Sequence, residues 1–221
     1  MTAKEYFGDW MRVIDKKELS KVMKWLQAQN IDTLCPIPKN VFKAFRVCDY
    51  NKLRVVFIGE EPYPQKGVAT GILFGNSSEV LSPSLEIIKE AVINYEIPHN
   101  LIEFDNTLES WARQGILMLN SALTCEINKI GCHIDIWQPF ISKLIQNICQ
   151  YNTGILFVLF GNQASTFKKY ISPFQIIMEV PHPAYFARKN IKMPYKVFTD
   201  INRFLENQYG EPIKFYHECF M

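Results

Sequence analysis

Two adjacent carboxylates and a tyrosine follow an apolar segment early in the chain. Residues 55–58, Val-Val-Phe-Ile, run into a glycine, then Glu60 and Glu61, a proline and Tyr63. An apolar run bounded by Gly and Pro is typical of a buried strand that opens into a loop. In open α/β sheets, ligands bind beyond the carboxyl ends of the strands, where a carboxylate can stabilise a cation or activate water. We therefore expect these three side chains at a ligand site.

Two further polar residues follow apolar segments. Asn120 ends the run Ile-Leu-Met-Leu over 116–119, and His182 lies between two prolines after the segment 175–180. An amide can donate and accept hydrogen bonds at once, and an imidazole can donate one to a developing anion. In a parallel sheet the residues that follow the strands meet at one edge, so we expect Asn120 and His182 to lie beside Glu60 and Glu61.

The elements that must position these residues alternate along the chain. Strands that are apolar along their whole length, separated by helices, favour a parallel sheet covered on both faces. The prediction is an α/β protein, a three-layer α/β/α fold around a central, mostly parallel four-stranded sheet. We expect strands at 54–58, 116–120, 155–161 and 175–180, and helices at 15–29, from an N-cap at Ser84, and at 106–114, 137–150, 162–171 and 196–207.

The composition fits one globular domain. The chain has 221 residues, of which 48% are hydrophobic and 21% charged, enough for a sizeable core. We expect a single domain over 1–221, with an N-terminal helical extension over about residues 1–35. The net charge of +2 alone does not indicate a nucleic-acid partner, although a local basic face would fit one.

Cysteines and hydropathy bear on cofactors and location. The six cysteines include no Cys-x-x-Cys pair, which argues against a zinc or iron–sulfur site. No apolar run approaches the roughly 20 residues that cross a bilayer, and no N-terminal signal is visible. We expect a cytoplasmic protein with reduced thiols, located in the host cell if its source is viral, and no contact with a membrane.

The order and spacing of the motifs resemble those of the family 1 uracil-DNA glycosylases, over most of the chain from about residue 37 to 205. No single motif is decisive, but together they indicate a common fold. The family's Gly-Gln-Asp-Pro-Tyr-His segment is matched by residues 59–64, its Gly-Leu-x-Phe by 71–74, its Pro-Ser loop by 82–85, its Leu-Leu-Leu-Asn strand and following Leu-Thr by 117–124, and its His-Pro-Ser-Pro-Leu by 182–186.

The resemblance implies a monofunctional DNA glycosylase that needs no metal or redox cofactor. Such an enzyme flips a base, here expected to be uracil, out of DNA and hydrolyses its N-glycosidic bond, which leaves an abasic site. The family pattern assigns catalysis to Glu61, which would act on water and the sugar cation, and to His182, which would stabilise the departing base.

The same resemblance assigns binding roles. Phe74 would stack on the base, Asn120 would read its edge, Tyr63 would exclude a thymine methyl group, and Glu60 would line the substrate site. The residues expected to contact DNA are Ser82 and Ser84 at the phosphates and Tyr185 or Phe186 as a wedge in the duplex. The basic residues that follow, Arg188, Lys189 and Lys192, fit either phosphate contacts or a solvated loop.

Four departures from the family pattern leave alternatives open. Glu61 replaces an aspartate, Glu60 a glutamine, Pro64 a histidine and Ala184 a serine. The chain could therefore be a glycosylase for a modified pyrimidine, or a catalytically weak DNA-binding or replication-associated scaffold. Its expected partner is DNA, and we expect a monomer. Whether a proteinaceous inhibitor also binds stays open.

Overall fold

A four-stranded parallel sheet lies at the centre of the computed structural model, which describes residues 2–219. The strand order is β4-β2-β6-β7, and every neighbouring pair is parallel. The predicted α/β fold with a four-stranded, mostly parallel sheet is therefore confirmed. The strands are β2 (Val55–Gly59), β4 (Ile116–Asn120), β6 (Leu156–Phe160) and β7 (Ile176–Val180).

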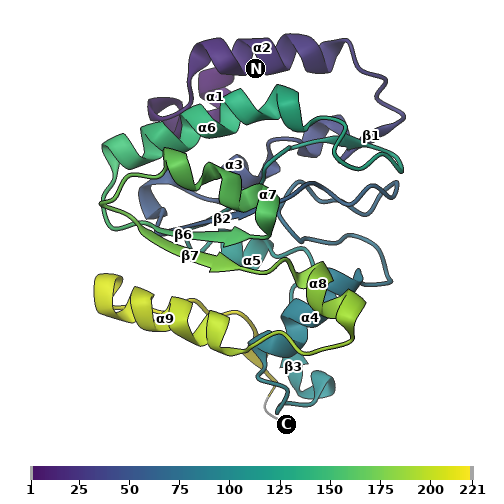
Figure 1. Cartoon of the computed structure of the whole chain (residues 1–221), viewed down its shortest axis with the longest axis vertical. Coiled ribbons are helices and arrows are strands. Elements are labelled where there is room, and N and C mark those ends of the chain that lie inside the picture. The colour runs from purple at the N-terminus through teal and green to yellow at the C-terminus, as the bar shows by residue number, and fades with distance from the viewer. Residues whose placement is uncertain (1, 220–221) are drawn as a thin grey trace.

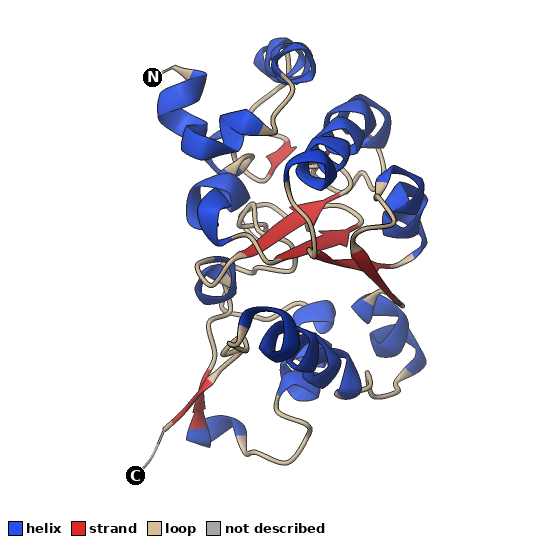
Figure 2. Cartoon of the chain, turned by 90° about the vertical axis from the view of Figure 1, so that its left-hand side faces the viewer, coloured by secondary structure: helices blue, strands red, loops and turns tan. Residues whose placement is uncertain are grey.

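Both faces of this sheet are covered by helices, which explains why its inner strands, β2 and β6, are apolar and buried along their length. Successive side chains of a strand point to opposite faces. In β2, Val56 and Ile58 belong to one core cluster, whereas Val55 and Phe57 belong to the other. Each face therefore buries its own half of every inner strand, and the sheet separates two hydrophobic cores. The helices that cover these cores lie on both sides of the sheet (Figures 1 and 2).

The layer that includes the N-terminus covers one face of the sheet (Figure 1). Helix α2 packs against α6, and its N-cap Asp15 accepts hydrogen bonds from the amides of Lys17 and Glu18. Trp10 is buried in the same core as Val56 of the sheet, so the N-terminal segment is part of this core. The helices of this layer are α1 (Ala3–Phe7), α2 (Lys16–Gln27), α3 (Lys43–Val47), α6 (Ile134–Tyr151) and α7 (Asn162–Ser165).

The second layer covers the opposite face (Figure 1). Helix α4 packs against α8, and the indole of Trp111 donates a hydrogen bond to the Phe215 carbonyl, 2.8 Å away, which ties the C-terminal segment to this core. The helices of this layer are α4 (Pro83–Val92), α5 (Glu109–Ala112), α8 (Pro183–Lys189) and α9 (Lys196–Tyr209).

Several short elements complete the fold, and the sequence did not predict them. Strand β1 (Leu34–Cys35) pairs antiparallel with β5 (Cys125–Glu126), and β3 (Ile102–Glu103) pairs with β8 (His217–Glu218). Two-residue strands are too short to show a periodicity. The 3₁₀ helices of the described chain are Gly8–Arg12, Pro38–Asn40, Tyr50–Lys52, His99–Leu101 and Thr166–Tyr170.

The bounds of three predicted helices need correction. The segment 162–171 divides into α7 and a 3₁₀ helix, and 106–114 contains only the single turn of α5. Ser84 is not the N-cap of α4. That place is taken by Ser82, whose hydroxyl accepts a hydrogen bond from the Leu85 amide at 3.3 Å. Proline at the first helical position fixes this start.

In the described part of the chain, no helix is both long enough and apolar enough to cross a membrane.

Candidate active site

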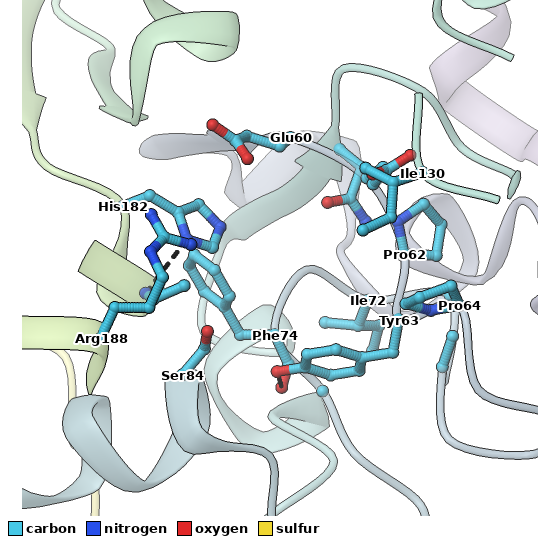
Figure 3. Close-up of a pocket in the computed structure, with 16 residues that line it drawn as sticks. Glu60, Pro62, Tyr63, Pro64, Ile72, Phe74, Ser84, Ile130, His182 and Arg188 are labelled. Carbon is cyan, nitrogen blue, oxygen red and sulfur yellow. Dashed lines mark hydrogen bonds between the residues drawn. The ribbon is translucent and has the colours of Figure 1, made fainter. Parts of the chain in front are cut away.

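Loops from three strands meet at the carboxyl edge of the sheet. Gly59 pairs with Asn120 across β2 and β4, and Phe160 pairs with Val180 across β6 and β7, so the residues that follow leave the sheet at one edge. They surround a pocket of about 300 Å³ (Figure 3). Of the residues predicted from the sequence, Glu60, Glu61, Tyr63, Phe74, Ser84, Asn120 and His182 all line it.

Short backbone contacts hold these loops together. The Ser121 hydroxyl and amide both donate to the Gly59 carbonyl, at 2.6 and 3.0 Å, and the Ala122 amide donates to the Glu60 carbonyl at 3.2 Å. A Cβ at position 59 would lie 2.2 Å from Leu73 Cδ1. Any larger residue at position 59 would therefore force the buried Leu73 side chain to move where the segment that carries Phe74 crosses the end of β2.

Asn120 presents an unused hydrogen-bond acceptor. Its side chain is only 6% exposed, and Oδ1 has no partner within the protein. Among the described residues, two other buried side-chain oxygens share this property, on Asn106 and Ser142, and neither residue lines the pocket. Because an unpaired buried acceptor is costly, this oxygen is suited to a ligand that brings its own N–H donor.

His182 is held in one tautomer. Its Nδ1 accepts a hydrogen bond from the Ala184 amide at 3.2 Å (Figure 3). Burial, with a smaller effect from the charge of Arg188, lowers the pKa of His182 to about 4, so the ring is neutral at physiological pH. A neutral imidazole that accepts at Nδ1 carries its proton on Nε2. His182 therefore supplies a neutral N–H donor to the pocket.

The two adjacent acids have different surroundings. Glu61 accepts a hydrogen bond from the Gly131 amide at 2.5 Å. Burial raises the pKa of Glu61, the Gly131 amide opposes this, and the neighbouring charge of Glu60 adds to it. Glu60 lies against Gly161, where a Cβ would come within 2.8 Å of its Oε1. Burial also raises the pKa of Glu60, and Arg188 opposes that shift.

The aromatic wall is built from Phe74 and Tyr63. Phe74 has a φ of 62°, a left-handed conformation that is unusual for a bulky residue. The Tyr63 hydroxyl donates to the Phe74 carbonyl at 3.0 Å and accepts from the Ser82 hydroxyl at 2.6 Å. Burial raises the pKa of Tyr63 to about 12, so this donor keeps its proton. The Phe74 ring stands edge-on to His182, with 5.4 Å between centroids.

The residues predicted to contact DNA separate into two groups. Ser84 lines the pocket, and Tyr185 is 42% exposed. Phe186 is only 6% exposed and belongs to the core between the sheet and the second layer of helices. This conformation therefore does not present Phe186 to DNA, because its ring serves packing. Ser82 is occupied in capping α4 and in holding Tyr63.

The pocket wall also includes residues that were not predicted in that role, among them Ile130 and Arg188. Ile130 comes from the loop between β5 and α6, and an isolated apolar residue in a loop gives no sequence signal. Arg188, expected only in a basic loop, forms part of the pocket wall (Figure 3). In the described residues, the group of three side chains that could hold a metal ion lies outside this pocket.

Comparison with known proteins shows the family. Residues 45–206 match the model of the Uracil DNA glycosylase superfamily. The chain is 32% identical over 185 residues to a uracil-DNA glycosylase of Sodalis glossinidius, covering 82% of this chain and 81% of that one. An equal identity over 183 residues relates it to the uracil-DNA glycosylase of Salmonella arizonae, with coverage of 82% and 80%. The chain therefore belongs to the uracil-DNA glycosylase superfamily, as the motifs predicted.

Solved structures agree on the fold. Mimivirus uracil-DNA glycosylase superposes with a TM-score of 0.73 at 21% identity, over 97% of this chain and 93% of that one. A variant of the mimivirus protein in complex with UGI gives the same score, at 22% identity and coverage of 96% and 94%. The protein of Nitratifractor salsuginis gives 0.61 at 20% identity, with coverage of 88% and 99%.

Proposed function

We propose that this chain is a monofunctional uracil-DNA glycosylase that hydrolyses the bond between N1 of uracil and C1′ of deoxyribose. Membership of the superfamily supports this activity. The observation that carries the substrate assignment is the buried, unpartnered Oδ1 of Asn120 in the pocket wall. This atom sits where a base flipped out of the duplex would be read.

Asn120 fits the edge of uracil. Its Oδ1 accepts from the N3–H of the base, and its amide nitrogen donates to O4. Cytosine has an amino donor and an unprotonated N3 at these two positions, so it would leave both groups of Asn120 mismatched in the amide orientation of this structure. A site built to hydrogen-bond its substrate rejects such analogues strongly, because buried polar groups then stay unpaired.

Tyr63 excludes pyrimidines that carry a substituent at C5. Its hydroxyl is held by two hydrogen bonds, to the carbonyl of Phe74 and from Ser82, so the ring cannot swing aside freely. A methyl or larger group at C5 would meet this fixed ring. The arrangement favours uracil over thymine and over the modified pyrimidines that the sequence left open.

His182 and Glu61 divide the chemistry. As the N1–C1′ bond breaks, its electron pair stays on the base, and the neutral Nε2–H of His182 donates to the developing charge on O2. The sugar becomes cationic. Glu61 stabilises that charge and accepts a proton from the water that attacks C1′. The products are free uracil and an abasic site.

Several further assignments belong to the same proposal. Ser84 and loop amides contact phosphates around the flipped nucleotide, and Tyr185 enters the duplex in its place. Glu60, beside Gly161, sets the charge around Glu61. We also propose a cytoplasmic monomer with one domain over 1–221, including the helical N-terminal segment of about 1–35. UGI, a protein inhibitor bound to the mimivirus relative, is the proposed inhibitor of this chain.

The test is an excision panel with the wild-type protein. Single- and double-stranded oligonucleotides carrying uracil, thymine, hydroxymethylated or glucosylated pyrimidines are incubated with the protein, and released base is quantified. Release of uracil alone is the expected result. Preferential release of a modified pyrimidine would assign another substrate, and binding to uracil DNA without any release would assign a scaffold role.

A further inference from the structure

A cluster of three potential metal ligands lies in the segment 126–133, whose Gly131 amide donates a hydrogen bond to Glu61. The carboxylate of Glu126, the thiol of Cys132 and the imidazole of His133 each offer one ligand atom, and these atoms lie within 4.8 Å of one another. Oxygen, sulfur and nitrogen donors together are the ligand set of zinc sites, whereas calcium and magnesium take oxygen ligands. We propose that these three residues form a Zn²⁺ site whose occupancy slows base excision.

Both ends of the segment 126–133 belong to or adjoin regular secondary structure. Glu126 ends β5, where it pairs with Leu34 of β1, and His133 is the N-cap of α6. His133 is only 5% exposed, and its ring packs edge-on against Trp25 at 4.6 Å between centroids. Ligands on anchored elements keep their geometry, so two of the three positions are prepared before any ion arrives.

The imidazole of His133 is oriented for metal binding. Its Nδ1 lies 3.0 Å from the Thr124 hydroxyl, which itself accepts a hydrogen bond from the Trp137 indole at 2.7 Å. Nε2 faces the other way and lies 3.9 Å from Oε1 of Glu126. Metal-binding histidines use this arrangement, in which one ring nitrogen donates to a neighbouring group and the other is the ligand.

Solvent can reach the site from the side of Cys132. The Cys132 side chain is exposed, and its sulfur accepts a hydrogen bond from the Glu126 amide at 3.3 Å. Lys129 pairs with the other carboxylate oxygen of Glu126 at 2.6 Å and is itself exposed. Exposed ion pairs contribute little to stability, so Lys129 can move away when a cation binds.

Zinc binding would be coupled to catalysis through Gly131, the residue that precedes Cys132. The Gly131 amide donates the hydrogen bond to Glu61. Zinc bonds of about 2.0–2.3 Å would draw the ligand atoms closer together than their present spacing. Cys132, on the exposed side, would then carry Gly131 with it. Because a displacement of about 1 Å at a reacting group can cost about 100-fold in rate, we expect zinc to slow excision by at least about tenfold.

The first test measures metal binding alone. Co²⁺ is titrated into the metal-free protein under a non-thiol reductant, and thiolate-to-cobalt absorption is followed, with Zn²⁺ as the competitor. We expect one Co²⁺ per chain, displaced by Zn²⁺. Cys132→Ser and Glu126→Gln should each weaken binding by more than about tenfold, since even outer partners of a metal site contribute that much. Cys219→Ser, at another exposed thiol, is the matched control and should bind as the wild type does.

Absence of a thiolate–cobalt band, or a band that survives in Cys132→Ser, would overturn the site.

The second test compares single-turnover uracil release with and without saturating Zn²⁺, followed by a chelator. This part rests on the proposed function, and the metal-free rate tests that function separately. Zn²⁺ should slow uracil release by the wild type, and the chelator should restore the rate. Zn²⁺ should not slow release by Cys132→Ser, and Mg²⁺ should not slow release by the wild type. Zinc binding with no change in rate would overturn the coupling.

Discussion

The hydroxyl of Tyr63 donates a hydrogen bond to the backbone carbonyl of Phe74, 3.0 Å away. The residue expected against C5 of the base therefore also fixes the residue expected to stack on its face. Phe74 needs this support, because its φ of 62° is a strained conformation for a phenylalanine. One hydroxyl thus links substrate exclusion to the shape of the aromatic wall.

Tyr63→Phe should loosen this wall without removing the block at C5. The Phe74 carbonyl and the Ser82 hydroxyl each lose a partner, so the free energy of unfolding should fall by about 1–3 kcal/mol and uracil release should slow. Thymine should still be disfavoured, since the ring remains, but less strongly than in the wild type, because no hydroxyl then holds the ring in place. Tyr95→Phe is the matched control, because its hydroxyl donates to the Met193 carbonyl at 2.9 Å, away from the pocket. Urea denaturation and single-turnover assays measure both effects, and a wild-type rate in Tyr63→Phe would contradict the linkage.

Asn120→Ala should lower uracil release by about 100- to 1,000-fold, the range found when a donor to a reacting group is removed. Affinity for uracil-free DNA should be unchanged, because phosphate contacts determine it. Asn106→Ala is the control, since its Oδ1 is also buried and unpaired but lies outside the pocket. Equal losses of rate in both variants would show that the effect of Asn120 is structural.

The low pKa of His182 predicts a pH-dependent stability. The pKa falls from an ordinary 6.5 to about 4 in the folded protein, mainly through burial. As pH falls, the unfolded chain takes up this proton first. The corresponding stability is fully present above pH 6.5 and is lost as pH falls to about 4. The unfolding free energy of the wild type should therefore fall relative to that of His182→Asn as the pH is lowered over this range.

Denaturation at a series of pH values measures that difference. The raised pKa values of Glu60 and Glu61 act with the opposite sign, but both acids are present in the wild type and in the variant, so they largely cancel. A difference that does not vary with pH would show that His182 is not held in its neutral form.

Tyr185 and Phe186 should respond differently to truncation. Tyr185→Ala removes a side chain that is 42% exposed, so affinity for duplex DNA should fall while stability stays near that of the wild type. Phe186→Ala empties a core position and should cost about 3–5 kcal/mol of stability. Fluorescence anisotropy and urea denaturation separate the two outcomes. Weaker DNA binding by a fully stable Phe186→Ala would reverse the assignment.

The sequence predicted the sheet and its edge because those features have strong local signals. Each strand is a mostly apolar run, and a polar residue marks the carboxyl end of three of them: Glu60 directly follows β2, Asn120 ends β4, and His182 comes two residues after β7. The contact of Gly131 with Glu61 has no such signal, since it joins positions 70 residues apart through a backbone amide. Short elements such as β1 and β5 were missed because two residues show no periodicity.

The sequence also did not predict the direction in which individual side chains point. Adjacent aromatics at Tyr185 and Phe186 look equivalent in sequence, and only the packing of α8 against α4 shows that one ring is buried. In the same way, Ser82 and Ser84 flank one proline. The extended backbone of Ser82 makes it the helix cap, and Ser84 enters the first turn and reaches the pocket.

We propose that Glu61 acts on water and the sugar cation within a pocket that also holds the base. Single-turnover release of uracil by Glu61→Gln, measured beside DNA affinity, tests it most directly. The glutamine keeps the size of the side chain and loses its charge, so we expect a rate about 100- to 10,000-fold below that of the wild type with unchanged affinity. A wild-type rate in Glu61→Gln would show that this carboxylate takes no part in the reaction.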